Sequence, residues 1–181
     1  MNTQNAFPKD ANSVAITYNG LISTDAQTLV GSGTTVAVPI FTFTGAIEVT
    51  ALYGVITTAL GNCTAAYWRT NDGSTQNSIT ASGGTSLTNA VAGGVIAKSA
   101  LAATALTLVA GTSAQVDESA TAHTPFFQNF VLQANPAAAS NIEFVYTTSD
   151  TPTTGAITFY LRWAPLATAN NGQLGGNVTS L

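Results

Sequence analysis

The stretch Ala156-Ile-Thr-Phe-Tyr-Leu-Arg-Trp163 has the clearest alternation of apolar and polar residues in the chain. Period-two alternation is typical of a β-strand whose sheet buries one face. We therefore predict a strand here, with four apolar side chains in or beside the core: Ile157, Phe159, Leu161 and Trp163.

A second alternating stretch, Asn141-Ile-Glu-Phe-Val-Tyr-Thr147, comes shortly before the first. It predicts another strand, with Phe144 and Tyr146 also in or beside the core. The link Thr148-Ser-Asp-Thr-Pro-Thr-Thr-Gly155 is rich in turn residues. From this arrangement we predict that the two strands form an antiparallel hairpin with a long loop.

Further strands are expected along the whole chain, because Thr, Val, Ile and aromatic residues favour pleated, half-buried surfaces. Pro39 cannot donate a hydrogen bond to a neighbouring strand, so its strand should be an edge strand or carry a bulge there. Residues 97–106 have some helical character, but strand or loop is favoured. The other predicted strands span residues 14–18, 26–30, 36–44, 47–58, 64–70, 76–81, 95–98, 105–109 and 126–134.

Short strands separated by frequent turn signals indicate an all-β sandwich or barrel. A parallel sheet would need crossover helices between its strands, and the sequence shows no such pattern. We predict an antiparallel two-sheet sandwich of the jelly-roll type over residues 13–166. The polar segments 1–12 and 167–181 are expected to be an extended N-terminal arm and a flexible C-terminal tail.

Charged residues make up only 7% of the 181 residues, and the formal net charge is −4. A nucleic-acid partner is not expected, because binding to phosphates needs a clustered basic face. The same shortage of basic residues argues against a polybasic membrane surface. Since the N-terminus has no apolar signal region and no stretch has the length of a membrane span, we expect folding in the cytoplasm.

The chain has one histidine and one cysteine, so it lacks the three or four Cys and His ligands of a typical zinc site. His123 would have to be the base of any Ser-His-Asp triad, but it lies in a polar loop sequence. Cys63 could form a nucleophilic pair with His123. We interpret Cys63 instead as a small buried apolar residue.

Paired carboxylates are the other catalytic arrangement to consider, because glycoside hydrolysis uses two of them. Glu48 and Glu143 both lie within predicted strands and could meet on one outer sheet face. Asp117 and Glu118 could contribute to a site for a hard cation, but two adjacent acids are typical of a solvated loop. We expect no catalytic residue, no cofactor and no bound metal.

Three stretches carry a resemblance to a known class of proteins. They are Gly45-Ala-Ile-Glu-Val-Thr-Ala-Leu-Tyr-Gly-Val-Ile-Thr-Thr58, Trp68-Arg-Thr-Asn-Asp-Gly73, and the two alternating strands with their link, through Leu166. Together they resemble small virion structural proteins of tailed bacteriophages, of the head decoration (cement) type. The resemblance implies a β-sandwich or jelly roll that assembles as a homotrimer on the major capsid protein. It also implies synthesis in the host cytoplasm, a place on the outer capsid surface, and no catalytic residues.

The residues leave other functions open. A tail, neck or fibre component of a phage, or a host-receptor-binding module, is the alternative, and clustered exposed aromatic residues would favour it. Within the N-terminal arm, Phe7 and Pro8 form an aromatic anchor followed by a residue of fixed φ. We expect these two residues to tether the protein to a neighbouring capsid or sister subunit.

Overall fold

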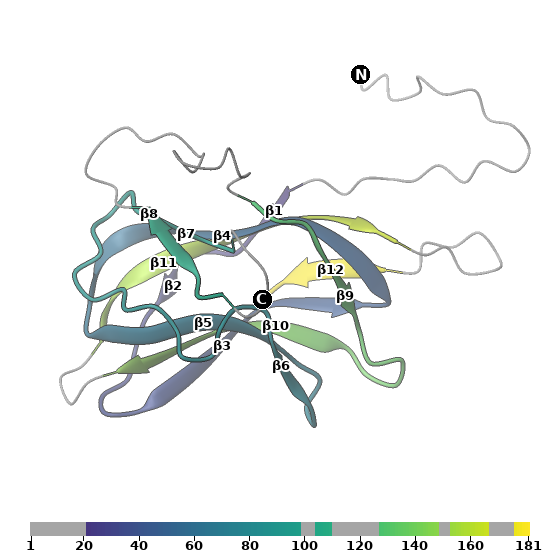
Figure 1. Ribbon diagram of the computed structural model, residues 1–181, viewed down its shortest axis with the longest axis horizontal. Coiled ribbons are helices and arrows are strands. Elements are labelled where there is room, and N and C mark those ends of the chain that lie inside the picture. The colour runs from purple at the N-terminus through teal and green to yellow at the C-terminus, as the bar shows by residue number, and fades with distance from the viewer. Residues whose placement is uncertain (1–20, 99–103, 110–126, 149–152, 167–175) are drawn as a thin grey trace, which may run out of the picture.

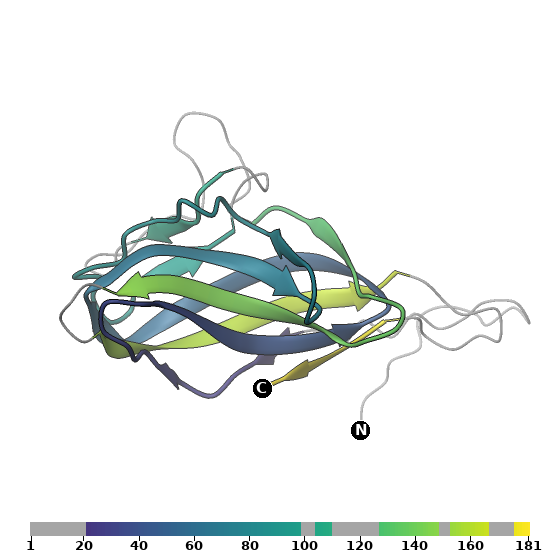
Figure 2. The same ribbon diagram turned by 90° about the horizontal axis from the view of Figure 1, so that it is seen from below.

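The computed structural model describes residues 21–98, 104–109, 127–148, 153–166 and 176–181, which form two antiparallel β-sheets packed face to face (Figures 1 and 2). Sheet A has the strand order β1-β11-β4-β7-β8, with β2 also paired to β11 and β9 also paired to β4. Sheet B has the order β12-β3-β10-β5-β6. The predicted all-β, two-sheet sandwich is therefore confirmed.

The strands of sheet A are β1 (Leu21–Ser23), β2 (Gln27–Thr28), β4 (Ala46–Gly61), β7 (Val95–Ala97), β8 (Thr107–Val109), β9 (Phe130–Gln133) and β11 (Thr154–Pro165). Those of sheet B are β3 (Thr35–Thr44), β5 (Cys63–Asn71), β6 (Gln76–Ser78), β10 (Ser140–Thr148) and β12 (Asn177–Ser180). Across these described ranges, no helix is long and apolar enough to cross a membrane.

The predicted hairpin between the two C-terminal strands is wrong. Strand β10 lies in sheet B between β3 and β5, whereas β11 lies in sheet A beside β4. The link between them therefore crosses from one sheet to the other. Their apolar faces meet across the sandwich, where the ring centroids of Phe144 and Phe159 are 5.0 Å apart.

The core fills the space between the sheets and contains all six residues predicted for it. Phe144, Tyr146, Ile157, Phe159, Leu161 and Trp163 each expose 3% of their surface or less. Phe144 also lies 5.7 Å from the Tyr146 ring and 6.1 Å from the Trp68 ring, measured between centroids. Tyr146 also holds the segment after β2 in place. Its hydroxyl accepts a hydrogen bond from the Val30 N–H and donates one to the Val30 carbonyl.

Strand β3 confirms the prediction made from Pro39. Along β10, the residue paired in β3 changes from Phe41 to Pro39 when Glu143 is reached. Ile40 therefore has no partner in the pairing and forms a bulge. The bulge puts both Ile40 and Phe41 in the core, which explains why the apolar phase of the sequence reverses at this point.

The last residues of the chain differ from the flexible tail expected over 167–181. Strand β12 pairs with Phe41–Thr44 of β3 and buries Val178. Gly176 permits this approach, because a Cβ there would collide with the carbonyl oxygen of Ala46. The arm 1–12, the strand expected at 14–18 and residues 167–175 lie outside the described residues.

The other strands agree with the sequence in position and differ in length. Strands β4 and β5 extend beyond the ranges 47–58 and 64–70, whereas β2, β6, β8 and β9 are shorter than the predicted strands that contain them. Strand β7 covers Val95–Ala97, and most of the ambiguous stretch after it, 99–103, lies outside the described residues.

We expect Trp163→Ala to lower the free energy of unfolding by about 3–5 kcal/mol, because the indole is buried at 3% exposure and the substitution leaves a cavity. Urea unfolding at neutral pH measures the change. Val131→Ala is the control, since Val131 is 60% exposed and its loss should change stability by less than about 0.5 kcal/mol. Equal effects of the two substitutions would contradict the assignment of Trp163 to the core.

Candidate functional site

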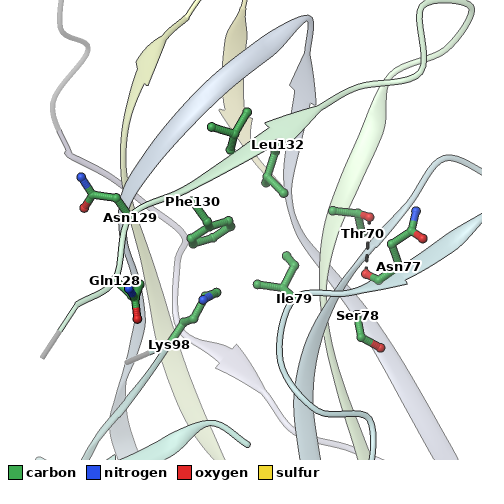
Figure 3. Close-up of a pocket in the computed structure, with 10 residues that line it drawn as sticks. Thr70, Asn77, Ser78, Ile79, Lys98, Gln128, Asn129, Phe130 and Leu132 are labelled. Carbon is green, nitrogen blue, oxygen red and sulfur yellow. Dashed lines mark hydrogen bonds between the residues drawn. The ribbon is translucent and has the colours of Figure 1, made fainter. Parts of the chain in front are cut away.

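A groove opens on one side of the sandwich, between the edge of sheet B and the edge of sheet A (Figure 3). We call it the β6–β9 groove, and its volume is about 390 Å³. This lies in the range of roughly 300–1,000 Å³ that is usual for small ligand sites. Its lining consists of Thr70, Asn77, Ser78, Ile79, Lys98, Gln128, Asn129, Phe130, Val131 and Leu132.

Strand β4 positions one wall of the groove. Along the edge that faces away from β11, β4 pairs with β9 at Ala46–Val49 and with β7 at Tyr53–Val55. Lys98 follows β7 and Phe130 begins β9, so the ends of these two strands bring the residues together. The Lys98 ammonium nitrogen lies 4.9 Å from the centre of the Phe130 ring, a cation–π distance.

The β5–β6 hairpin forms the opposite wall, and its turn begins with Asn71-Asp-Gly73, a sequence typical of tight turns. The carboxylate oxygen Oδ1 of Asp72 accepts from the N–H groups of Ser74 (2.9 Å) and Thr75 (2.6 Å). Its other oxygen accepts from the side-chain amide of Asn135 at 3.0 Å. Because Asn135 follows β9, this last bond links the hairpin to the opposite wall.

These donors lower the pKa of the Asp72 carboxyl well below its ordinary value. The hydrogen bond from the Thr75 N–H contributes most, followed by those from Ser74 and Asn135. The ionised form is therefore the one that holds the turn.

A largely buried ion pair links β5 to β10 next to the groove. The Arg69 Nε donates to the Glu143 carboxylate at 2.6 Å, and the Asn71 amide donates to its other oxygen at 2.8 Å. The Glu143 side chain is only 7% exposed. Arg69 also donates to the Gln76 side chain, which connects β6 to the same group.

Lys98 is the ionisable residue of the groove lining and is 4% exposed. Desolvation by burial lowers the pKa of its ammonium group. The groove thus combines an apolar floor with amide and hydroxyl groups at its rim. This chemistry suits the binding of an uncharged segment, and the described lining lacks the acid and base pair that hydrolysis needs.

The proposed pairing of Glu48 with Glu143 is wrong, because the two residues belong to different sheets. Glu48 accepts a hydrogen bond from Asn129 at 3.3 Å, whereas Glu143 is occupied by Arg69 and Asn71. The interpretation of Cys63 as a buried residue is confirmed, and burial raises the pKa of its thiol to about 12.

Phe7, Pro8, His123, Asp117 and Glu118 lie outside the described residues. No sequence pattern indicated the groove itself, since Lys98 and Phe130 belong to separate predicted strands. In the described part of the chain, no group of three or more His, Cys, Asp or Glu residues is placed to hold a metal ion.

Searches of protein-family models, of curated proteins and of solved structures found no match to the chain.

The Asp72 turn predicts how stability depends on pH. A carboxyl whose pKa is lowered by folding stabilises the protein above its unfolded pKa of about 3.9, and this stabilisation is lost as the pH falls. We expect Asp72→Asn to lower the urea midpoint at pH 7 and to reduce the loss of stability between pH 5 and pH 2. Asp25→Asn, at an exposed position outside this turn, should keep the wild-type midpoint at pH 7. An Asp72→Asn midpoint equal to wild type at pH 7 would contradict the prediction.

Proposed function

We propose that this chain is a non-enzymatic structural protein of a tailed-phage virion, a head decoration or cement protein. It binds the major capsid protein on the outer capsid surface and stabilises contacts between capsomers. We further propose that it acts as a homotrimer made in the host cytoplasm, without a nucleic-acid or membrane partner. The sequence resemblance supports this function.

The observation that carries the proposal is the shortage of charge on the outside of the sandwich. Among the charged side chains of the described residues, only those of Asp25 and Arg162 are largely in contact with solvent, and the others are partly or fully buried. Arg69 and Glu143 pair with each other, and Lys98 is buried. A surface of this kind can be covered by a neighbouring subunit with little cost of removing charges from water.

We also infer jelly-roll connectivity within the sandwich. In support, the chain crosses between the sheets after β2, β3, β4, β6, β9, β10 and β11, while β5 and β6 stay in one sheet. This gives the order β1-β11-β4-β7 opposite β3-β10-β5-β6, which fits a double Greek key.

One observation favours the alternative of a tail, neck or fibre component or a host-receptor-binding module. Tyr53 and Tyr160 stack at 4.9 Å on the outer face of sheet A, and Phe127 lies 5.3 Å from Tyr53. All three are partly exposed. Aromatic residues are enriched at binding surfaces, so this cluster offers a contact for a receptor or another virion protein.

Imaging of the source particle by electron microscopy distinguishes the two functions. We expect density for this protein on the outer capsid surface, and we expect particles without it to release their DNA at a lower temperature. Restoring the protein to such particles should restore the release temperature, which controls for damage during their preparation. Density confined to the tail, neck or fibres would overturn the decoration function in favour of the alternative.

A further inference from the structure

The β6–β9 groove is bounded by two strand edges. Among the described residues, β6 pairs only with β5, and β9 pairs only with β4. A free strand edge presents N–H and C=O groups to an incoming chain. Between the edges lie the apolar side chains of Ile79, Phe130 and Leu132. Free edges beside an apolar floor suit an extended peptide that carries one apolar anchor.

The rim of the groove has hydrogen-bonding groups to offer such a peptide. The side chains of Asn77, Ser78 and Gln128 are exposed, and none is hydrogen-bonded to another described residue. Amide groups can both donate to and accept from a peptide bond. No carboxylate lines the groove, so a segment with uncharged side chains would enter without covering an unpartnered carboxylate.

The N-terminal segment of this chain has these properties. Residues 2–8, Asn-Thr-Gln-Asn-Ala-Phe-Pro, contain no charged side chain and one aromatic residue. Pro8 disfavours a helical conformation at Phe7 and favours an extended one. We propose that the β6–β9 groove binds Phe7 and Pro8 of a second copy of this chain, with the Phe7 ring against Phe130.

The proposed homotrimer, and not the reach of the segment, favours a second copy over the same chain. The described chain begins at Leu21 in β1, at one edge of sheet A, whereas β9 lies across β11 and β4 at the other edge. A head-to-tail ring needs two different surfaces on each subunit and closes when the rotation between them is right. The 14 steps from Phe7 to Leu21 span up to about 50 Å, enough to reach either the groove of the same chain or that of a neighbour, and the cross-linking experiment below distinguishes the two. The inference rests on the proposed homotrimer and names the contact that holds it together.

Disulfide trapping on the purified full-length protein tests the contact. One chain carries Asn5→Cys and another, with a tag of different mass, carries Ser78→Cys, and the two are co-expressed and oxidised. Native Cys63 is buried with a pKa of about 12, so it should not react. We expect a cross-link between the two kinds of chain. Thr57→Cys, at an exposed site towards the other end of β4, replaces Ser78→Cys in the control and should give none.

Substitutions within the contact give the second measurement. Adding Phe7→Ala to the first chain, or Phe130→Ala to the second, should lower the cross-linked fraction at least tenfold. Phe7→Leu should retain most of it, because an apolar anchor remains. Val38→Ala is the matched control for Phe130→Ala, since Val38 is also a partly buried residue packed on the core but lies in β3.

The outcomes separate this inference from the proposed function. A cross-link between the two kinds of chain that fails to form, as it would if the segment bound the groove of its own chain, or that forms equally with Thr57→Cys, overturns the inference. So does a cross-link that survives Phe7→Ala. None of these results bears on capsid binding, which the particle images measure. Conversely, a cross-link that depends on Phe7 supports the inference even if the density lies on the tail.

Discussion

The contact between Phe144 and Phe159 holds the two sheets together. Each residue belongs to a strand that is central in its own sheet: β10 lies between β3 and β5, and β11 lies between β4 and the short strands β1 and β2. When the two rings meet at 5.0 Å, the apolar faces of both sheets are aligned over one core. Trp68 of the neighbouring strand β5 and Tyr146 of β10 itself also pack against the Phe144 ring.

Because the apolar side chains point inward, the contacts between strands on the outer faces are made by polar side chains. On sheet B, the Glu143 carboxylate binds donors from Arg69 and Asn71, and Arg69 reaches Gln76. One buried charge thereby fixes three neighbouring strands in register. Removing either member of such a pair leaves the other uncompensated, which typically costs about 3–5 kcal/mol. The same arrangement keeps charge from the outer surface, and the proposed decoration function depends on this shortage of exposed charge.

Much of the fold can be predicted from the sequence, because alternation reports which side chains share a face. It identified the six core residues of β10 and β11, and the missing N–H of Pro39 predicted either an edge strand or the bulge that β3 has. Alternation does not report which strands are neighbours. A hairpin and a pair of strands facing each other across a sandwich have the same pattern, so the long link between β10 and β11 was misinterpreted as a hairpin loop. Strand β12 was missed because Val178 is its single buried apolar residue.

The groove was beyond prediction for a related reason. Lys98 and Phe130 meet because β7 and β9 pair with different parts of the same edge of β4. Nothing in their own sequences specifies that shared partner. Only Asp72 had a local signal, its turn sequence, and the bond to Asn135 that joins the two walls is again a tertiary contact.

The two sides of the sandwich differ in a way that bears on assembly. On one side, β12 extends the edge of sheet B, contacts β1 and places Val178 in the core. On the other side, β6 and β9 leave an apolar floor open between them, and the Asp72–Asn135 bond holds the two walls together. The two sides of the sandwich are therefore different surfaces, one covered by the last strand, β12, and the other open. A closed ring of identical subunits needs two different surfaces on each subunit, and the open side is the one at which we propose that a neighbouring copy binds.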